Sequence, residues 1–182
     1  MLKLVKVTHR DPDFKKIKQV YEQVFPRVER LPLSFLKMRA KTGNGEFLSL
    51  YDDDEWAGFA YSVVGRKVVY LFFLAIAPAS QDGGLGSQAL TLLQEYYDRP
   101  ILLSAEREVE DAPNLEQRKR RQAFYAKNGF KQTGFYTIEK NFEEYDLLAD
   151  KLPVKPELFT SLLRQFLKQR ERYFVPFKLK RK

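Results

Sequence analysis

Cysteine is absent from this chain of 182 residues, and histidine occurs once, as His9. The absence of cysteine excludes disulfide bonds, a cysteine nucleophile, thiolate metal ligands and iron-sulfur clusters. His9 follows the first expected strand, where we interpret it as an ordinary surface residue. We therefore expect neither a metal site nor covalent catalysis through a thiol.

Long apolar runs are also lacking. No uncharged stretch is long enough to span a bilayer, and the first residues do not combine a basic segment with an apolar one, as a signal peptide does. With no cysteine, this favours a reducing compartment. We expect a soluble, unprocessed, cytoplasmic protein without a membrane partner.

The net charge of +8 is concentrated at one end of the chain. Residues 164–182 hold eight basic residues and one acidic residue, whereas residues 1–163 hold 24 basic and 23 acidic residues. Such a terminal charge run is usually a solvated helix end and a partly ordered terminus, although it could contact RNA, a membrane or another subunit. Nucleic-acid binding by the domain itself is thus not favoured.

Apolar periodicity in the first half predicts strands between helices. The expected elements are a strand at 2–7, a helix from Asp11 to Pro26, a helix at 34–41 and strands at 47–51, 56–64 and 68–77. Asp11 is a suitable N-cap before Pro12, and Pro26 ends the helix. The three later strands are typical of an antiparallel meander, and the third is apolar throughout, so we place it at the centre of the sheet.

The second half predicts a parallel crossover followed by further helices and strands. The expected elements are a helix with apolar residues from Leu85 to Tyr96, a strand at 100–105, a helix at 115–128 closed by Gly129, strands at 132–139 and 145–148, and a last helix from Pro156. Strand, helix and strand in this order form a parallel pair. The last helix is amphipathic and could pack within the chain or across a dimer.

Residues 80–87, Ser-Gln-Asp-Gly-Gly-Leu-Gly-Ser, form a glycine-rich turn between the central strand and a helix. Glycines permit close approach to a ligand, and a helix start offers unpaired N–H groups and a positive dipole end. The turn alone could equally be an ordinary connection. It lacks the lysine of a nucleotide P-loop and the spacing of a dinucleotide fingerprint.

A second motif, Phe-Tyr-Ala-Lys-Asn-Gly-Phe at 124–130, follows the turn in a set order. Together, Gln81-Asp82-Gly83-Gly84-Leu85-Gly86 and this motif resemble the GNAT superfamily of acyl-CoA-dependent N-acetyltransferases, as a small, single-domain, bacterial-type member. Gly84 and Tyr125 are 41 residues apart, with a strand and a helix between them. The resemblance covers about residues 2–150.

The resemblance implies a three-layer α/β (α+β) fold in which helices flank a mixed central sheet of six to seven strands. The last amphipathic helix would be an addition to that fold. We accordingly expect an acetyltransferase domain at 1–150, with the C-terminal helix and basic tail at 151–182 packed on it or extending it.

Coenzyme A would be held mainly through the main chain. Amides of the turn would bind the pyrophosphate, and the end of the central strand would offer backbone groups to the pantetheine arm. The implied cofactor contacts are Leu74, Ala75, Ile76, Gln81, Asp82, Gly83, Gly84, Leu85, Gly86, Ser87 and Lys127.

Tyr125 is the implied catalytic acid. When an amine attacks a thioester, the tetrahedral intermediate expels a thiolate, which a nearby hydroxyl can stabilise or protonate. The attacking amine must itself lose a proton to a carboxylate or to water. The central strand carries no carboxylate, so Glu106 after the strand at 100–105 is the first candidate base, and Glu29 in the loop at 25–32 is the second. Either could instead be a solvated loop charge.

One departure from the family concerns the helix before Tyr125. Many members have asparagine and alanine where this chain has Arg118 and Arg121. The basic run at 118–121 could bind the 3′-phosphate or an acidic substrate. We favour the alternative that it is a solvated helix face balanced by the nearby acidic loop.

These features lead to one expected function and two alternatives. We expect direct acetyl transfer from acetyl-CoA to a primary amine of a small molecule or peptide, in a ternary complex and without a metal. The protein could be a homodimer. A non-catalytic acyl-CoA-binding or regulatory module is the first alternative, and a nucleic-acid-binding protein that uses the basic tail is the second.

Overall fold

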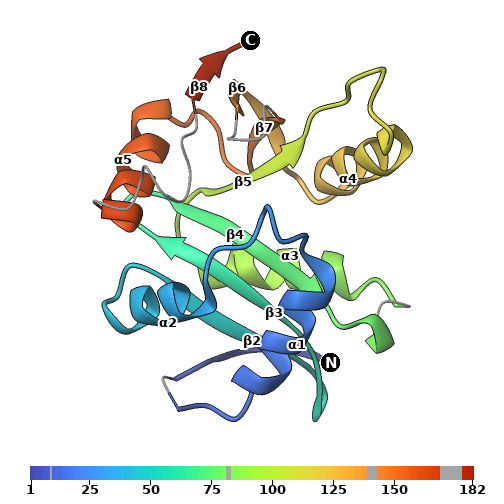
Figure 1. Ribbon diagram of the computed structural model, residues 1–182, viewed down its shortest axis with the longest axis vertical. Helices are drawn as coiled ribbons and strands as arrows, with labels where there is room; N and C mark the ends of the chain where they lie inside the picture. Colours follow the sequence, from blue (N-terminus) through green and yellow to red (C-terminus); the bar gives the residue numbers. More distant parts are fainter. Residues whose placement is uncertain (9, 81–82, 139–142, 169–177) are drawn as a thin grey trace. The chain divides into compact units, whose positions relative to one another are not determined.

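The computed structural model describes residues 1–8, 10–80, 83–138, 143–168 and 178–182 (Figure 1). The elements are β1 (Leu2–Lys6), α1 (Phe14–Val24), α2 (Leu33–Lys41), β2 (Glu46–Asp52), β3 (Glu55–Val64), β4 (Val69–Ile76), the short 3-10 helix η1 (Pro78–Ser80), α3 (Leu85–Tyr96), β5 (Ile101–Glu106), α4 (Leu115–Lys127), β6 (Lys131–Ile138), β7 (Glu144–Ala149), α5 (Pro156–Leu167) and β8 (Lys178–Arg181). None of the helices in these ranges is long and apolar enough to cross a membrane.

The described strands hydrogen-bond in the order β1-β2-β3-β4-β5-β7-β6-β8. The predicted meander and the parallel pairing of β4 with β5 are confirmed. The sheet has eight strands rather than six or seven, because residues 178–181 pair antiparallel with β6. This end of the basic segment is therefore a strand, which the charge run did not predict.

The chain folds as two compact units. Unit 1 comprises residues 1–65 and 71–96, and unit 2 comprises residues 66–70 and 97–182. Unit 1 contains β1 to β3, most of β4 and the helices α1 to α3. Unit 2 contains the start of β4, the strands β5 to β8 and the helices α4 and α5.

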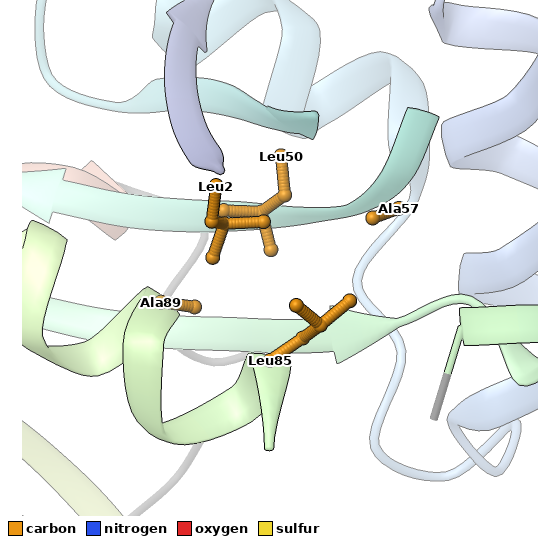
Figure 2. Close-up of a cluster of buried hydrophobic side chains, with 5 residues drawn as sticks. All are labelled: Leu2, Leu50, Ala57, Leu85 and Ala89. Atoms are coloured by element: carbon orange, nitrogen blue, oxygen red, sulfur yellow. The ribbon is translucent and has the colours of Figure 1, made fainter. Parts of the chain in front are cut away.

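Unit 1 has the predicted three layers, because the side chains of β2 point alternately to the two faces of the sheet and both faces are buried. Phe47 contacts Phe14 of α1, with ring centroids 5.3 Å apart, whereas Leu50 belongs to a cluster on the α3 side. Figure 2 shows Leu85 and Ala89 of α3 facing the sheet residues of that cluster, which are Leu2, Leu50 and Ala57. Alternation with period two lets one strand serve both layers.

The start of α1 differs from the prediction. The helix begins at Phe14 rather than at Pro12, although the carboxylate of Asp11, the predicted N-cap, accepts a hydrogen bond from the Asp13 N–H at 3.0 Å. Asp13 is buried, and its carboxylate accepts hydrogen bonds from the hydroxyls of Ser49 and Tyr51 on β2. Its side chain is thus used to join α1 to the sheet, and it does not cap the helix.

A bulge in β3 brings its backbone against the end of β4. Leu50 pairs with Gly58 and Tyr51 with Trp56, so Ala57 is the extra residue. The Ala57 carbonyl accepts a hydrogen bond from the Ala77 N–H at 2.8 Å. A Cβ on Gly58 would lie 2.2 Å from the Ala75 carbonyl oxygen, so only glycine fits here.

Replacing Gly58 by alanine is expected to lower the free energy of unfolding by about 1–3 kcal/mol, because backbone must move to admit the methyl group. Gly134→Ala is the matched control: both glycines have positive φ, of 156° and 82°, but no atom lies within 4 Å of a Cβ at Gly134. Urea unfolding of both variants measures the difference. Equal losses would show that crowding at Ala75 costs nothing.

In unit 2, α5 buries its apolar face within the single chain. The buried side chains are Phe159, Leu162, Leu163, Phe166 and Leu167. Phe159 packs edge-on against Tyr70, with ring centroids 5.2 Å apart. The amphipathic pattern of this helix is thus satisfied by packing in the chain itself.

Candidate active site

The glycine-rich turn joins β4 to α3. Gln81 and Asp82 lie outside the described residues, whereas Gly83 and Gly84 are exposed and α3 begins at Leu85. Gly84 has a φ of 71°, a left-handed conformation that favours glycine, and its carbonyl accepts the N–H groups of Ser87 and Gln88. A Cβ at Gly83 or Gly84 would meet no atom of the described residues within 4 Å, so the surface that these residues leave beside the two glycines is open.

The first turn of α3 is anchored to the sheet. The Leu85 side chain is buried in the cluster of Figure 2, while Gly86 and Ser87 are half-buried beside the turn. The first N–H groups of an α-helix have no intrahelical partner, and they carry its positive dipole end. The turn thus presents backbone donors from a fixed helix start.

The end of β4 has one buried and two half-buried side chains. Ala75 is buried, whereas Leu74 and Ile76 are partly buried against the cluster of Figure 2. Their side chains thus belong to the core or pack against it, which leaves the main chain as the part of these residues that could meet a ligand. The close contact with Gly58 fixes the backbone that connects them to η1.

Tyr125 lies in the last turn of α4, whose end has the geometry of a Schellman motif. Gly129 has a φ of 85°, the Phe130 N–H donates to the Tyr125 carbonyl at 3.0 Å, and the Gly129 N–H donates to that of Ala126 at 3.1 Å. The buried Phe130 ring packs edge-on against the Tyr125 ring at 6.1 Å. The predicted end of the helix at Gly129 is confirmed. Phe130 holds Tyr125 in two ways, through the hydrogen bond to its backbone carbonyl and through the contact with its ring.

Gly129→Ala is expected to destabilise the fold by about 1 kcal/mol, because alanine disfavours positive φ. For a chain of this length, this loss corresponds to a fall in Tm of about 2–4 °C. Differential scanning calorimetry measures the fall in Tm. Ala126→Gly, a substitution inside the same helix, is the comparison. An unchanged Tm for Gly129→Ala would mean that the left-handed residue does not constrain the end of α4.

Tyr125 is half-buried, and desolvation raises the pKa of its phenol above the ordinary value, an effect that the positive charge of Arg121 opposes. No hydrogen-bond acceptor or donor for this hydroxyl occurs among the described residues. A protonated phenol at neutral pH can donate a proton. Tyr125 therefore has the protonation state that the predicted role requires.

Glu106 is the last residue of β5 rather than the first of a loop, and it is buried. Its Oε1 accepts a hydrogen bond from the Asn114 amide at 3.2 Å, and its Oε2 forms an ion pair with the Arg121 guanidinium. The Gln122 amide donates to its backbone carbonyl at 3.0 Å. Both carboxylate oxygens thus have partners.

Arg118 is buried, which corrects the interpretation of this helix face as solvated. Its guanidinium donates to the Asn114 side chain at 2.7 Å, to the Arg107 carbonyl at 3.1 Å and to the Glu143 carboxylate at 2.9 Å. These bonds connect α4 to the end of β5 and to the residue before β7. They commit the guanidinium to the protein itself, away from any phosphate.

The remaining predicted residues are at the surface or half-buried. Lys127 is exposed in the last turn of α4, where its charge is favourable to the helix dipole. Glu29 is half-buried in a turn after α1, in which its N–H donates to the Pro26 carbonyl at 3.0 Å. His9 lies outside the described residues.

The predicted residues thus fall into two sets, one in each unit. Unit 1 holds the described part of the turn, the end of β4 and Glu29, and unit 2 holds Tyr125, Glu106 and Lys127. The expectation that acidic residues, Glu106 among them, balance the basic run holds for Arg121, which pairs with Glu106, whereas the bonds of the buried Arg118 escaped sequence reasoning. The four-residue spacing of Asn114 and Arg118 was the one local signal for them. In the part of the chain that the structure describes, no group of three or more acidic or histidine side chains could hold a metal ion.

The sequence and the fold are both similar to those of acetyltransferases. The model of the acetyltransferase (GNAT) family matches residues 13–130. A Bacteroides thetaiotaomicron protein assigned to the GNAT acetyltransferases is 26% identical, with a TM-score of 0.75 over 91% of this chain and 95% of that one. No curated protein matches the sequence.

Two more distant structures share the fold. Arabidopsis thaliana Naa50, in complex with the bisubstrate analogue CoA-Ac-MVNAL, is 18% identical, with a TM-score of 0.60 over 83% of this chain and 99% of that one. The aminoglycoside 6′-N-acetyltransferase from Enterococcus faecium is 15% identical, with a TM-score of 0.61 over 84% and 99%. Since the family model matches well over half of the sequence, this chain belongs to the acetyltransferase (GNAT) family.

Proposed function

We propose that this protein transfers the acetyl group of acetyl-CoA to a primary amine by direct attack in a ternary complex. The observation that carries the proposal is the turn at Gly83 and Gly84, which is open to solvent and leads into an anchored helix start in a chain of this family. Backbone donors at a helix start suit a pyrophosphate. The complex of Naa50 with a CoA-containing analogue supports the same donor.

The cofactor contacts follow the sequence prediction. We propose that the amides from Gly83 to Gly86 bind the pyrophosphate, and that backbone groups of Leu74, Ala75 and Ile76 bind the pantetheine arm. The open surface at the two glycines and the fixed backbone at Ala75 support this assignment. The exposed Lys127 could add a phosphate contact.

Tyr125 is proposed as the general acid. The amine nitrogen forms a bond to the thioester carbonyl carbon, and the C–S bond then breaks with its electron pair passing to sulfur. The Tyr125 hydroxyl gives its proton to this sulfur, and free coenzyme A leaves as the thiol. The proton lost by the amine passes to a base and then to solvent, from which the phenolate recovers its proton.

The base is proposed to be one of the two predicted carboxylates. Glu106 is a buried carboxylate at the end of β5, but its oxygens are engaged by Asn114 and Arg121. Glu29 is half-buried in a turn next to the exposed Val28. Glutamine variants of each, assayed from pH 6 to 9, separate the two, because the variant that lacks the base loses the acidic limb of the pH profile.

The acceptor is proposed to be a small-molecule or peptide amine. The neighbours named above act on an aminoglycoside or bind a peptide-containing analogue. A homodimer and a cytoplasmic location stay predictions from the sequence. The apolar face of α5, which could have served a dimer, is already buried within the chain.

An acceptor screen tests the proposal. Purified protein and acetyl-CoA are mixed with polyamines, amino acids, aminoglycosides and peptides with free amino termini, and release of free coenzyme A is measured. We expect at least one amine class to accelerate release, with an acetylated product of the matching mass. Tight acetyl-CoA binding by calorimetry with no accelerated release for any amine would contradict the enzymatic proposal.

A further inference from the structure

Arg121 stands one helical turn before Tyr125 on α4, and residues four apart lie on the same side of a helix. Its guanidinium is partly exposed, with 44% of the side chain accessible, and forms an ion pair with the nearly buried Glu106 on β5. Among the charged groups of the described residues, Arg121 is the one whose field acts on the Tyr125 phenol. All three residues belong to unit 2.

Glu106 is itself held in place. The Asn114 side-chain amide donates to its Oε1, and the Oδ1 of Asn114 in turn accepts a hydrogen bond from the guanidinium of the buried Arg118 at 2.7 Å. This arrangement fixes the position of the Glu106 carboxylate, and the ion pair with Glu106 fixes the position of Arg121.

We propose that Arg121, positioned by its ion pair with Glu106, stabilises the phenolate that Tyr125 becomes when its proton passes to the departing thiolate of coenzyme A. Glu106 then acts as the counter-ion of Arg121 rather than as the base, which leaves Glu29 or water to accept the proton of the amine. The inference rests on the proposed function, and it concerns a position at which many family members have alanine.

Proton transfer from Tyr125 needs such help. A thiol has a pKa of about 8.5 and an unperturbed phenol one of about 10, so proton transfer from a phenol to a thiolate is unfavourable. Burial of Tyr125 raises the pKa of the phenol and makes the transfer still less favourable. A fixed cation beside the phenolate opposes this effect without taking part in proton transfer.

A double-mutant cycle tests the inference, with kcat and the KM for acetyl-CoA measured at pH 7.5 on the best acceptor. We expect Arg121→Ala to lower kcat about tenfold in the wild-type background and less than about twofold in the Tyr125→Phe background. The KM for acetyl-CoA should change little, and Arg121→Lys should restore most of the activity. Arg120→Ala is the matched control, because Arg120 is exposed on the same helix and its guanidinium donates to the Glu116 carbonyl.

Glu106→Gln should lower kcat, as Arg121→Ala does, but should have no further effect on kcat when Arg121→Ala is already present. The Glu106→Gln variant should keep the acidic limb of the pH profile. Equal effects of Arg121→Ala in both Tyr125 backgrounds would overturn the inference. So would a change confined to the KM for acetyl-CoA, since it would make Arg121 a phosphate ligand. If the wild type binds and turns over acetyl-CoA but Tyr125→Phe is fully active, the inference falls while the acetyltransferase stands. If the wild type shows no transfer, both fall.

Discussion

A glutamate in place of Gly84 is expected to abolish acetyl-CoA binding. Gly84 faces solvent at the start of α3, where the proposed pyrophosphate site lies, so the new carboxylate would meet a doubly charged ligand at the same helix end. The new side chain would occupy the open space at the turn, and repulsion between like charges should weaken binding by at least about a hundredfold. Isothermal titration calorimetry with acetyl-CoA measures the loss.

The chain offers a close control at the end of α2. Gly43 has a φ of 76°, compared with 71° at Gly84, and neither position has an atom within 4 Å of an added Cβ. Gly43→Glu therefore introduces the same charge and the same backbone strain, of about 1 kcal/mol, away from the proposed site. We expect it to bind acetyl-CoA like the wild type. Wild-type affinity in Gly84→Glu would contradict the proposed cofactor site.

Removal of the Tyr125 hydroxyl is expected to lower kcat about a hundredfold, the typical contribution of a general acid. The KM for acetyl-CoA should stay within about twofold, because the ring and its contact with Phe130 remain. Initial rates of coenzyme A release by Tyr125→Phe measure both quantities. The raised pKa of Tyr125 keeps the phenol protonated, so kcat of the wild type should not fall through Tyr125 as pH rises to about 9.

Tyr96→Phe is the control for this substitution. It removes a hydroxyl that donates to Glu46 in unit 1, at the far end of α3 from the turn. We expect full activity. An equal loss of kcat in both variants would indicate a general effect on stability, and no loss in Tyr125→Phe would remove Tyr125 from the mechanism.

Local patterns were sufficient for most of the fold. The order of helices and strands follows from apolar periodicity, and the end of α4 follows from Gly129, because a left-handed residue is a local requirement. The strand β8 was missed because Leu179 is its single apolar residue. Its pairing depends on β6, far away in the sequence.

The candidate site likewise combines residues that local motifs predicted with residues that they did not. The glycine turn and Tyr125 were found from short motifs, and the pairing of Arg121 was expected only as a general balance of charge with the acidic residues that include Glu106, whereas the surroundings of Arg118 were not found. Arg118 meets Glu143, and Arg121 meets Glu106, only after β5, α4 and β7 have assembled. Asp13 shows the same limit, since its partners Ser49 and Tyr51 come from a strand more than thirty residues later. Charged residues in a sequence do not reveal their partners when these lie on other elements.

The bulge at Ala57 has a consequence for the evolution of this region. Trp56 donates to Ser49 and Phe59 contacts Tyr21, so both side chains lie on the α1 side although they are three positions apart, which a regular strand does not allow. Loss of Ala57 would restore regular alternation and leave Gly58 and Phe59 opposite Leu50 and Ser49, whereas loss of a residue later in β3 would send every following side chain to the opposite layer. We therefore expect β3 to tolerate a one-residue deletion at the bulge far better than one beyond it.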